Sequence, residues 1–340
     1  MVSRVDSTHR PGDRWRTGPT TRDARQIPRF SASNRQKFLA EFRLKRPAVL
    51  TGGLANWPGT LFDLRRLADR FGALPVLTYR VPSKAKARRM SSIRSDFYVW
   101  SDRGGDRKQL RHWTFARFLA ALRKGSAHYC MINGIKNSRL RDLLAAETGE
   151  FSCFPLDATT TESARCEFFI GSKDTGPGLH HDGAVENFLC QLIGAKRVTL
   201  FSPADVPYLY PADSWLAPTG HFSAVADSFH PDYERYPLFR RATAYRCRLD
   251  VGDVLYIPPY WYHDTSPQGT SATVTLRNAP PSKTWGTAKQ RHALNEISAL
   301  LYRSLGEFGP RARLAFASRL AHDLLSGLYG PDRNRKPPKG

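Results

Sequence analysis

The sequence predicts a β-rich α+β protein, in which a sandwich or barrel follows an N-terminal part made of helices and short strands. From about residue 164, short runs of β-branched and aromatic residues are separated by Gly, Pro and Asp. Many short strands with turn signals indicate a sandwich or barrel, because βαβ units would place helical patterns between the strands. After Trp285 apolar residues recur at helical spacing, which predicts a C-terminal pair of helices.

The N-terminal part is expected to be mostly helical up to about residue 72. Asn34 and Thr114 are cap residues, because each precedes a series of apolar residues at helical spacing. The expected elements are a helix that carries Phe38, Leu39 and Phe42, a strand at Pro47–Thr51, a helix at Leu61–Phe71 and a helix at Phe115–Leu122.

The β-rich half contains six strand patterns, and Gly194-Ala195 between two of them predicts a tight hairpin. The expected strands are Cys166–Ile170, Asn187–Ile193, Arg197–Phe201, Tyr245–Leu249, Val254–Ile257 and Ala272–Leu276. Two helices are expected after them, one around residues 294–305 and one at Arg311–Leu328.

These patterns divide the chain into four parts. Residues 27–285 are expected to form one large domain with its β-rich core at about 164–280, and residues 286–330 form the helical pair. Residues 1–26 and 331–340 are basic, aperiodic and contain proline, so both are expected to be disordered tails.

The charge of the chain is its clearest compositional feature. The 340 residues carry a net charge of +22, which attracts nucleic acid, acidic peptides and other anions without naming one. No apolar run approaches the roughly 18 residues of a membrane span, and no apolar segment follows the first basic residues. The five cysteines form no CxxC pair. We therefore expect a soluble cytoplasmic protein with nucleic acid as a candidate partner and no membrane partner.

His180, Asp182 and His263 form the pattern with the most specific chemistry. His180 and Asp182 are two positions apart, so on a strand they point to the same face, and His263 ends the segment Gly252–His263 farther along the chain. Two imidazoles and one carboxylate on one side of a metal leave the opposite positions open, as in non-haem Fe(II) oxygenases. The sequence therefore predicts a metal site made by these three residues.

The sequence around these residues resembles the JmjC/cupin-like 2-oxoglutarate oxygenases, and within them the asparaginyl hydroxylase that inhibits hypoxia-inducible factor. The resemblance covers roughly residues 27–330 and is carried by Leu179–Asp182, Asn187–Arg197, Leu209–Pro211, Pro231–Pro237 and Gly252–His263. It implies a double-stranded β-helix, a jelly roll whose wide end holds the metal. It also implies that the C-terminal helices form a homodimer interface.

The same resemblance implies Fe(II) as the metal and 2-oxoglutarate as the co-substrate. Lys196 matches the lysine that pairs with the distal carboxylate of 2-oxoglutarate, and a cation inside a barrel needs such an anion. Tyr129 matches a tyrosine that hydrogen-bonds the same carboxylate, and Asn187 matches an asparagine near the metal-side end. Thr175 and Arg277 are expected to replace two family residues that bind the co-substrate and are absent here. No catalytic residue beyond the metal ligands is expected.

One departure from the family leaves two alignments open. Asn187 follows His180 by seven residues, one more than in the relatives. Either one residue bulges after Asp182, or the ligand position is His181 and Gly183 stands where the carboxylate should be. The second alignment gives the His-x-Gly arrangement of iron halogenases, in which chloride takes the vacant position. We favour the bulge, because Leu179-His180-x-Asp182 matches the usual start of the family motif.

The sequence thus predicts an Fe(II)/2-oxoglutarate dioxygenase that hydroxylates an aliphatic C–H bond, with a peptide or protein side chain as the expected substrate. Three alternatives are an Fe(II)/2-oxoglutarate halogenase, an oxygenase that acts on RNA or is associated with the ribosome, and a non-catalytic metal-binding cupin. The substrate groove does not match the asparaginyl hydroxylase at Gly220–Ser223 and Ala279–Pro281, so the sequence does not identify the substrate.

Overall fold

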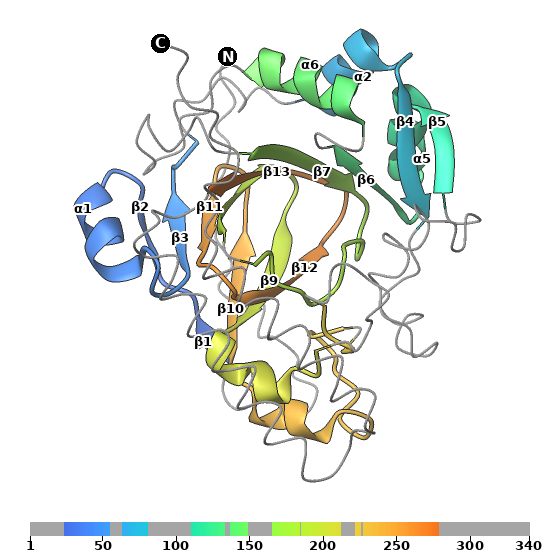
Figure 1. Cartoon of the computed structure of the whole chain (residues 1–340). Coiled ribbons are helices and arrows are strands. Elements are labelled where there is room, and N and C mark those ends of the chain that lie inside the picture. The colour runs from blue at the N-terminus through green and yellow to red at the C-terminus, as the bar shows by residue number, and fades with distance from the viewer. Residues whose placement is uncertain are drawn as a thin grey trace, which may run out of the picture.

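Two β-sheets face each other in the described part of the chain and form a jelly roll (Figure 1). The computed structural model describes residues 24–54, 63–80, 110–132, 137–148, 165–183, 185–211, 222–225 and 227–278. The helical pair expected at 286–330, the tail at 331–340 and the first 23 residues lie outside these ranges, so the expected dimer interface does too.

The smaller sheet has the strand order β1-β10-β9-β12, and the larger sheet has the order β2-β3-β11-β8-β13-β7-β6-β4-β5. His180 adds a short segment beside β12, because it forms an isolated antiparallel bridge with His263. The core strands are β7 (Arg165–Gly171), β8 (Glu186–Ile193), β9 (Lys196–Phe201), β10 (Ala244–Leu249), β11 (Val254–Ile257), β12 (Tyr262–Pro267) and β13 (Ser271–Asn278). The predicted β-rich jelly-roll core is therefore confirmed, and each expected core strand lies within an observed one.

The alternation of side chains along β13 shows how one strand serves two environments. Ala272, Val274 and Leu276 are buried in the main hydrophobic core on the outer face of the larger sheet. The alternate residues Thr273 and Arg277 turn to the other face, where they contact Lys196 and Asp182. The barrel interior thus receives polar side chains from a strand whose other face is apolar.

Three helices cover the outer face of the larger sheet: α2 (Leu64–Phe71), α5 (Phe115–Arg123) and α6 (Ser138–Thr148) (Figure 1). The side chain of Asp63 caps α2 by accepting from the Arg65 amide, and Thr114 caps α5 by accepting from the Arg117 amide. Within the described residues, no helix has the length and hydrophobicity needed to cross a membrane.

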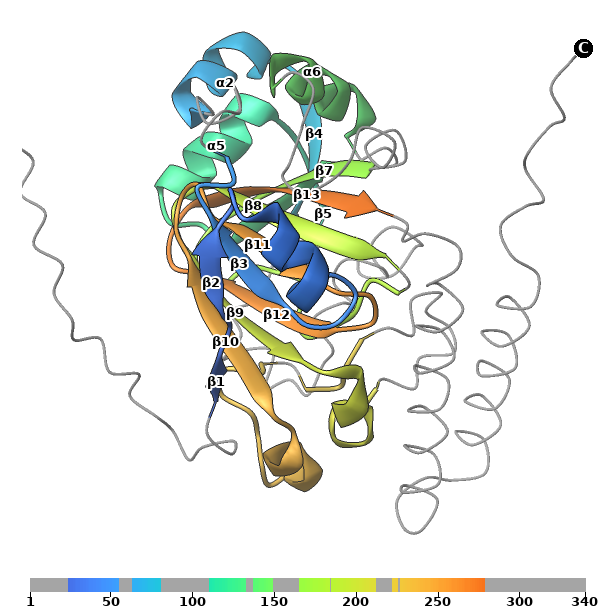
Figure 2. The same ribbon diagram turned by 90° about the vertical axis from the view of Figure 1, so that its left-hand side faces the viewer.

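The N-terminal elements close one side of the barrel, where α1 (Arg35–Lys37) and β2 (Arg29–Ser31) lie beside β3 (Ala48–Thr51) (Figure 2). Asn34 caps α1 as predicted, by accepting from the Lys37 amide at 3.1 Å. The helix continues as a π-helix over Phe38–Phe42, and the buried Phe38 ring meets Tyr256 of β11 edge-on at 4.9 Å.

The predicted boundary of the N-terminal tail at residue 26 is slightly too late. Arg25–Gln26 form β1, which pairs in parallel with Tyr245 and Arg246 of β10. The Arg25 guanidinium lies over the Tyr245 ring and donates to its hydroxyl at 3.2 Å. These contacts with a distant strand hold a segment whose composition alone resembles a tail.

Three strands that the sequence pattern did not predict extend the larger sheet: β4 (Pro75–Arg80), β5 (Leu110–Thr114) and β6 (His128–Ile132). Arg111 and His112 interrupt the apolar pattern of β5, and β6 pairs with β7, which begins more than thirty residues later in the chain. These strands therefore depend on pairing with distant parts of the chain, which a local sequence pattern does not show. This extension carries Tyr129 to the edge of the barrel.

Two 3₁₀ helices, η5 (Pro203–Tyr208) and η6 (Pro237–Arg241), belong to a lobe beyond the smaller sheet. Val206, Leu209 and Phe239 pack in its core against Phe201 and Tyr262 of β9 and β12. The lobe thus buries the ends of the two strands that carry Lys196 and His263.

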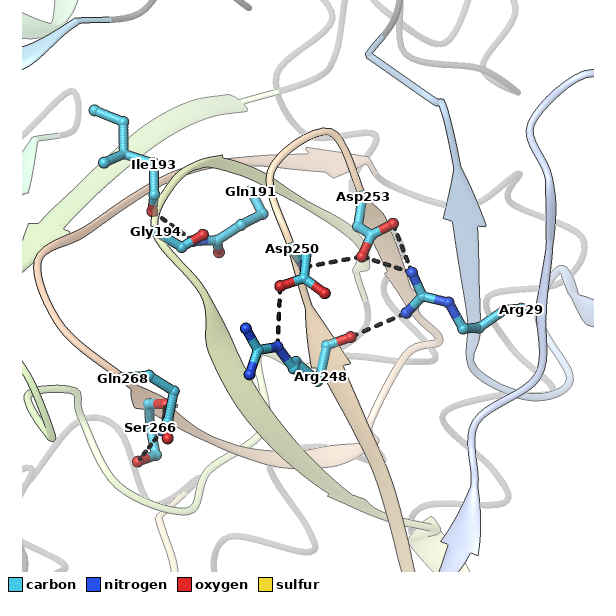
Figure 3. Close-up of polar contacts among 9 residues, drawn as sticks. All are labelled: Arg29, Gln191, Ile193, Gly194, Arg248, Asp250, Asp253, Ser266 and Gln268. Carbon is cyan, nitrogen blue, oxygen red and sulfur yellow. Dashed lines mark hydrogen bonds and ion pairs between the residues drawn. The ribbon is translucent and has the colours of Figure 1, made fainter. Parts of the chain in front are cut away.

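Polar contacts at one end of the barrel fix two turns (Figure 3). Asp253 accepts from Arg29 Nη2 through both carboxylate oxygens, at 2.8 and 2.7 Å, and from the Asp250 amide at 2.9 Å. Gln191 Nε2 donates to the carbonyls of Ile193 and Gly194 in the turn between β8 and β9, at 2.7 and 3.1 Å. The hairpin predicted at Gly194-Ala195 is wrong, because this turn takes the chain from the larger sheet into the smaller one and the two strands do not pair. These side chains connect β2 to the turn before β11 and hold the turn that precedes β9.

We expect Asp253→Ala to lower the free energy of unfolding by about 1–2 kcal/mol, because it leaves a backbone amide and a guanidinium without their acceptor. Arg248→Ala is the matched control, since the Arg248–Asp250 pair is exposed on both sides and its loss should cost under about 0.5 kcal/mol. Urea denaturation followed by circular dichroism measures both. Equal losses in the two variants would contradict the assignment of Asp253 as the residue that fixes the turn.

Candidate metal centre

His180, Asp182 and His263 lie together at the interior of the barrel, as the sequence pattern predicted. Their ligand atoms all lie within 4.8 Å of one another. Asp182 Oδ1 is 3.6 Å from His180 Nε2, and Asp182 Oδ2 is 3.5 Å from His263 Nε2. The bridge between the backbones of His180 and His263 explains this proximity, because it places two residues distant in sequence side by side.

The two imidazoles are held with the same nitrogen free for a metal. His180 Nδ1 is 2.9 Å from the carbonyl of Gly178, and His263 Nδ1 is 3.2 Å from the carbonyl of Trp261. A carbonyl can only accept, so each Nδ1 carries the proton and each Nε2 keeps its lone pair. This is the outer hydrogen bond that orients metal-ligating histidines in proteins.

The charge states also suit a divalent cation. Burial, and then the neighbouring His180, lower the pKa of His263 to about 4, so its ring is neutral at physiological pH. Burial would raise the pKa of Asp182, but Arg277 and the two histidines oppose this and hold the pKa well below its usual range. Two neutral imidazoles and one carboxylate are the donor set of non-haem Fe(II) sites.

Asp182 is fixed by two further side chains. Asn187 Nδ2 donates to Oδ2 at 2.6 Å, and Arg277 Nη2 donates to Oδ1 at 3.1 Å. The other terminal nitrogen of Arg277 pairs with Glu167 of β7 at 3.2 Å. The structure thus places two residues that were expected at the co-substrate, Asn187 and Arg277, directly against the carboxylate ligand.

His181 points away from this cluster. Its buried ring meets Tyr262 edge-on at 4.8 Å, and its Nδ1 accepts from the amide of Gly183 at 3.0 Å. Gly183 has a φ of +77°, and its carbonyl accepts from the Tyr260 amide. His180, and not His181, therefore faces His263, which agrees with the favoured alignment.

Lys196 is a buried basic side chain, and the described residues provide no carboxylate to neutralise its charge. It is 5% exposed, and its Nζ donates across the barrel to the Thr273 hydroxyl at 3.0 Å. No carboxylate of the described residues pairs with it, and burial alone lowers its pKa from 10.5 to about 7. Because a desolvated, unpaired ammonium is unfavourable, the buried position of Lys196 favours an anionic ligand.

Tyr129 and Thr175 meet beside Gly171 of β7. A Cβ atom added at Gly171 would lie 2.9 Å from the Tyr129 ring, and the Thr175 hydroxyl would be closer still. Both side chains are buried, and Thr175 Oγ1 donates to the Ser172 carbonyl at 2.7 Å. Ser271, two residues before Thr273, pairs with Gly171. The structure thus brings both residues to the end of β7 that borders Lys196.

Several residues of the site were not found from the sequence. Thr273 had no motif, and Glu167 lies in an ordinary strand pattern. The Gly178 and Trp261 carbonyls carry no side-chain signal at all. The strand positions of Glu167 and Thr273 could have indicated these two residues, because they alternate with core residues that face the opposite side of their strands.

A jelly roll that brings two histidines and one carboxylate together inside it defines a cupin-type protein whose residues could hold a metal. The family model described as the cupin-like domain matches residues 35–277, and the chain therefore belongs to that family. The match includes all the residues of the metal cluster and Lys196.

Curated relatives match part of the chain. It is 36% identical over 174 residues to tRNA wybutosine-synthesizing protein 5 of Gallus gallus, which covers 48% of this chain and 52% of that protein. It is 34% identical over 195 residues to the Homo sapiens protein of the same name, covering 52% and 59%. It is 34% identical over 121 residues to lysine-specific demethylase 8 of Xenopus tropicalis, covering 34% and 26%.

The chain therefore spans about half the length of the first two relatives. The JmjC domain is represented among its relatives, for instance by Jumonji C domain-containing protein 5 of Drosophila melanogaster, which confirms the family-level resemblance. None of the relatives named here is an asparaginyl hydroxylase, so the narrower resemblance stays a prediction.

We expect Lys196→Met to stabilise the protein without ligands, and more at pH 7 than at pH 9. The folded-state pKa is about 7 against 10.5 for a free lysine, so the penalty for the buried charge is full below pH 7 and fades as the pH approaches 10.5. Between pH 7 and pH 10.5, each pH unit should reduce the difference in unfolding free energy between Lys196→Met and wild type by up to about 1.4 kcal/mol.

Urea denaturation of the metal-free variant and wild type at a series of pH values measures this difference. Lys124→Met is the matched control, because Lys124 is exposed and its replacement removes no buried charge. A constant difference for Lys196→Met would contradict the buried, unpaired state of Lys196.

Proposed function

We propose that the protein is an Fe(II)/2-oxoglutarate-dependent dioxygenase that hydroxylates an aliphatic C–H bond. JmjC relatives are generally oxygenases or demethylases and typically use Fe(II) and 2-oxoglutarate. The observation that carries the proposal is the pairing of two features inside one barrel: a two-histidine, one-carboxylate cluster, and a buried lysine that no carboxylate of the described residues neutralises.

His180, Asp182 and His263 would hold the metal. Three protein donors would leave other coordination positions for a bidentate ligand and O₂. Fe(II) with 2-oxoglutarate supplies the oxidising chemistry, and the protein contributes orientation and protection from water.

Lys196 and Thr273 would bind the distal carboxylate of 2-oxoglutarate. The ammonium would gain an ion pair with an anion beside its hydrogen bond to a neutral hydroxyl, which favours its charged form at neutral pH. Tyr129 and Thr175 lie at the nearby end of β7, beside Gly171. Tyr129 would supply the hydroxyl, because the Thr175 hydroxyl already donates to a backbone carbonyl. A dicarboxylate has suitable chemistry, since one carboxylate would pair with the lysine and the other would supply oxygen ligands to a metal.

Arg277 and Asn187 would act on Asp182 instead of on the co-substrate. Each donates to a different oxygen of the carboxylate, so together they fix its orientation. Phe222 stacks on His180 with ring centroids 5.1 Å apart and covers the other face of that imidazole. These contacts restrict the ligand geometry and shield one metal ligand from water.

The halogenase alternative has less support. In a His-x-Gly site chloride needs a vacant position, whereas Asp182 lies between the two histidines and His181 packs among tyrosines. The non-catalytic metal-binding cupin also has less support, because a buried Lys196 without a bound anion destabilises the fold and such a protein needs no co-substrate to neutralise it.

The substrate class rests on different observations. The resemblance to the asparaginyl hydroxylase favours a peptide or protein side chain. RNA is the second candidate, favoured by the net charge of +22 and by relatives that are named tRNA wybutosine-synthesizing protein 5. Both fit a hydroxylase, and they differ in the partner that should stimulate turnover.

We expect His180→Ala and His263→Ala each to weaken Mn(II) binding by more than about 100-fold, because loss of a ligand exceeds the effect of losing its outer partner. Both should abolish succinate formation from 2-oxoglutarate with Fe(II). His181→Ala should keep metal binding within a few-fold of wild type, with circular dichroism as the check on folding. Loss of metal binding only in His181→Ala would favour the halogenase alignment.

If RNA is the substrate, transfer RNA should raise succinate formation above the rate without substrate. Heparin is the control, because it presents a polyanion without bases and should bind the basic surface without raising turnover. Equal stimulation by both, or by neither, would contradict the RNA candidate. Stimulation by peptides alone would leave the protein side chain as the substrate class.

A further inference from the structure

Arg277 lies between two carboxylates at the metal centre. Its Nη2 is 3.1 Å from Asp182 Oδ1, and its Nη1 is 3.2 Å from Glu167 Oε2. The carboxylates of Asp182 and Glu167 are each 12% exposed, and the arginine side chain is 28% exposed. One guanidinium therefore serves two carboxylates that are almost shielded from water.

The strand register explains this arrangement. Arg277 of β13 is paired with Asn187 of β8, and Thr275, two residues before it, is paired with Glu167 of β7. Directly paired residues point to the same face of a sheet, so all four side chains face the barrel interior. Glu167 thus enters the interior on the strand next to the arginine and on the same side as the metal ligands.

A second carboxylate close to the three proposed metal ligands could itself bind the metal, and the ion pair with Arg277 opposes this. A free Glu167 would add negative charge to the site and compete for a divalent cation, because oxygen ligands attract such ions. The guanidinium forms an ion pair with this carboxylate and carries a positive charge that opposes a second cation nearby. With Arg277 present, the three charged side chains sum to one negative charge.

We infer that Arg277 is a positioning residue that sets the charge of the metal centre and keeps Glu167 from joining the two histidines and Asp182 as a ligand. This rests on the proposed metal site and goes beyond it, since it assigns the composition of the ligand set to a residue that does not itself bind metal. Asp182 would then be the single carboxylate ligand because the ion pair with Arg277 keeps Glu167 away from the metal.

The test is a series of variants with different net charge, with Mn(II) binding measured by calorimetry on the full chain without 2-oxoglutarate. Arg277→Met leaves two negative charges and should bind Mn(II) about tenfold more tightly. Glu167→Gln leaves a net charge of zero and should bind about tenfold more weakly. The double variant Glu167→Gln/Arg277→Met restores the wild-type charge and should return to wild-type affinity.

Arg277→Lys keeps the positive charge and should also bind as wild type does, which guards against a variant that merely folds poorly. The visible absorption of the Co(II)-loaded Arg277→Met protein should report an added ligand, and this change should disappear in the double variant. Unchanged or weaker Mn(II) binding in Arg277→Met would overturn the inference. If wild type itself binds no Mn(II), the proposed function fails first.

Discussion

The barrel interior holds charged groups that are largely removed from water, and each must be balanced by another group of the protein or by a ligand. Asp182 is balanced by Arg277 and Asn187, and Glu167 by the same arginine. Lys196 has a hydroxyl instead of a carboxylate. The negative groups are therefore satisfied by the fold, whereas the positive one at the opposite side of the site is left for a ligand.

Most of these charged residues stand on strands, whereas Asp182 lies in the segment before β8. His263 and Lys196 stand on β12 and β9, while Arg277 and Thr273 stand on β13, whose other face packs into the main hydrophobic core. The core side chains fix the backbone, and the alternation of the strand then fixes the direction of the polar side chains. The same residues that stabilise the sheet thus hold the site within hydrogen-bonding distances.

The sequence predicted the strands and the metal cluster for a clear reason. Short β-branched runs indicate core strands locally, and the spacing of His180 and Asp182 puts them on one face without knowledge of the fold. Relations between distant strands carry no such local signal. The Arg277–Glu167 pair depends on how β13 meets β7, and β4, β5 and β6 depend on pairing with β7 to become a sheet extension.

The turn between β8 and β9 has a consequence for how this protein can vary. Gly194 has a φ of +68°, and a Cβ atom there would collide with the backbone of Thr270, so the turn admits little besides glycine. The turn also takes the chain from the larger sheet into the smaller one, where β9 begins at Lys196. A larger residue at position 194 would push the turn away from Thr270 and move the first residue of β9 with it. Related chains that keep the lysine inside should therefore keep a glycine at this turn.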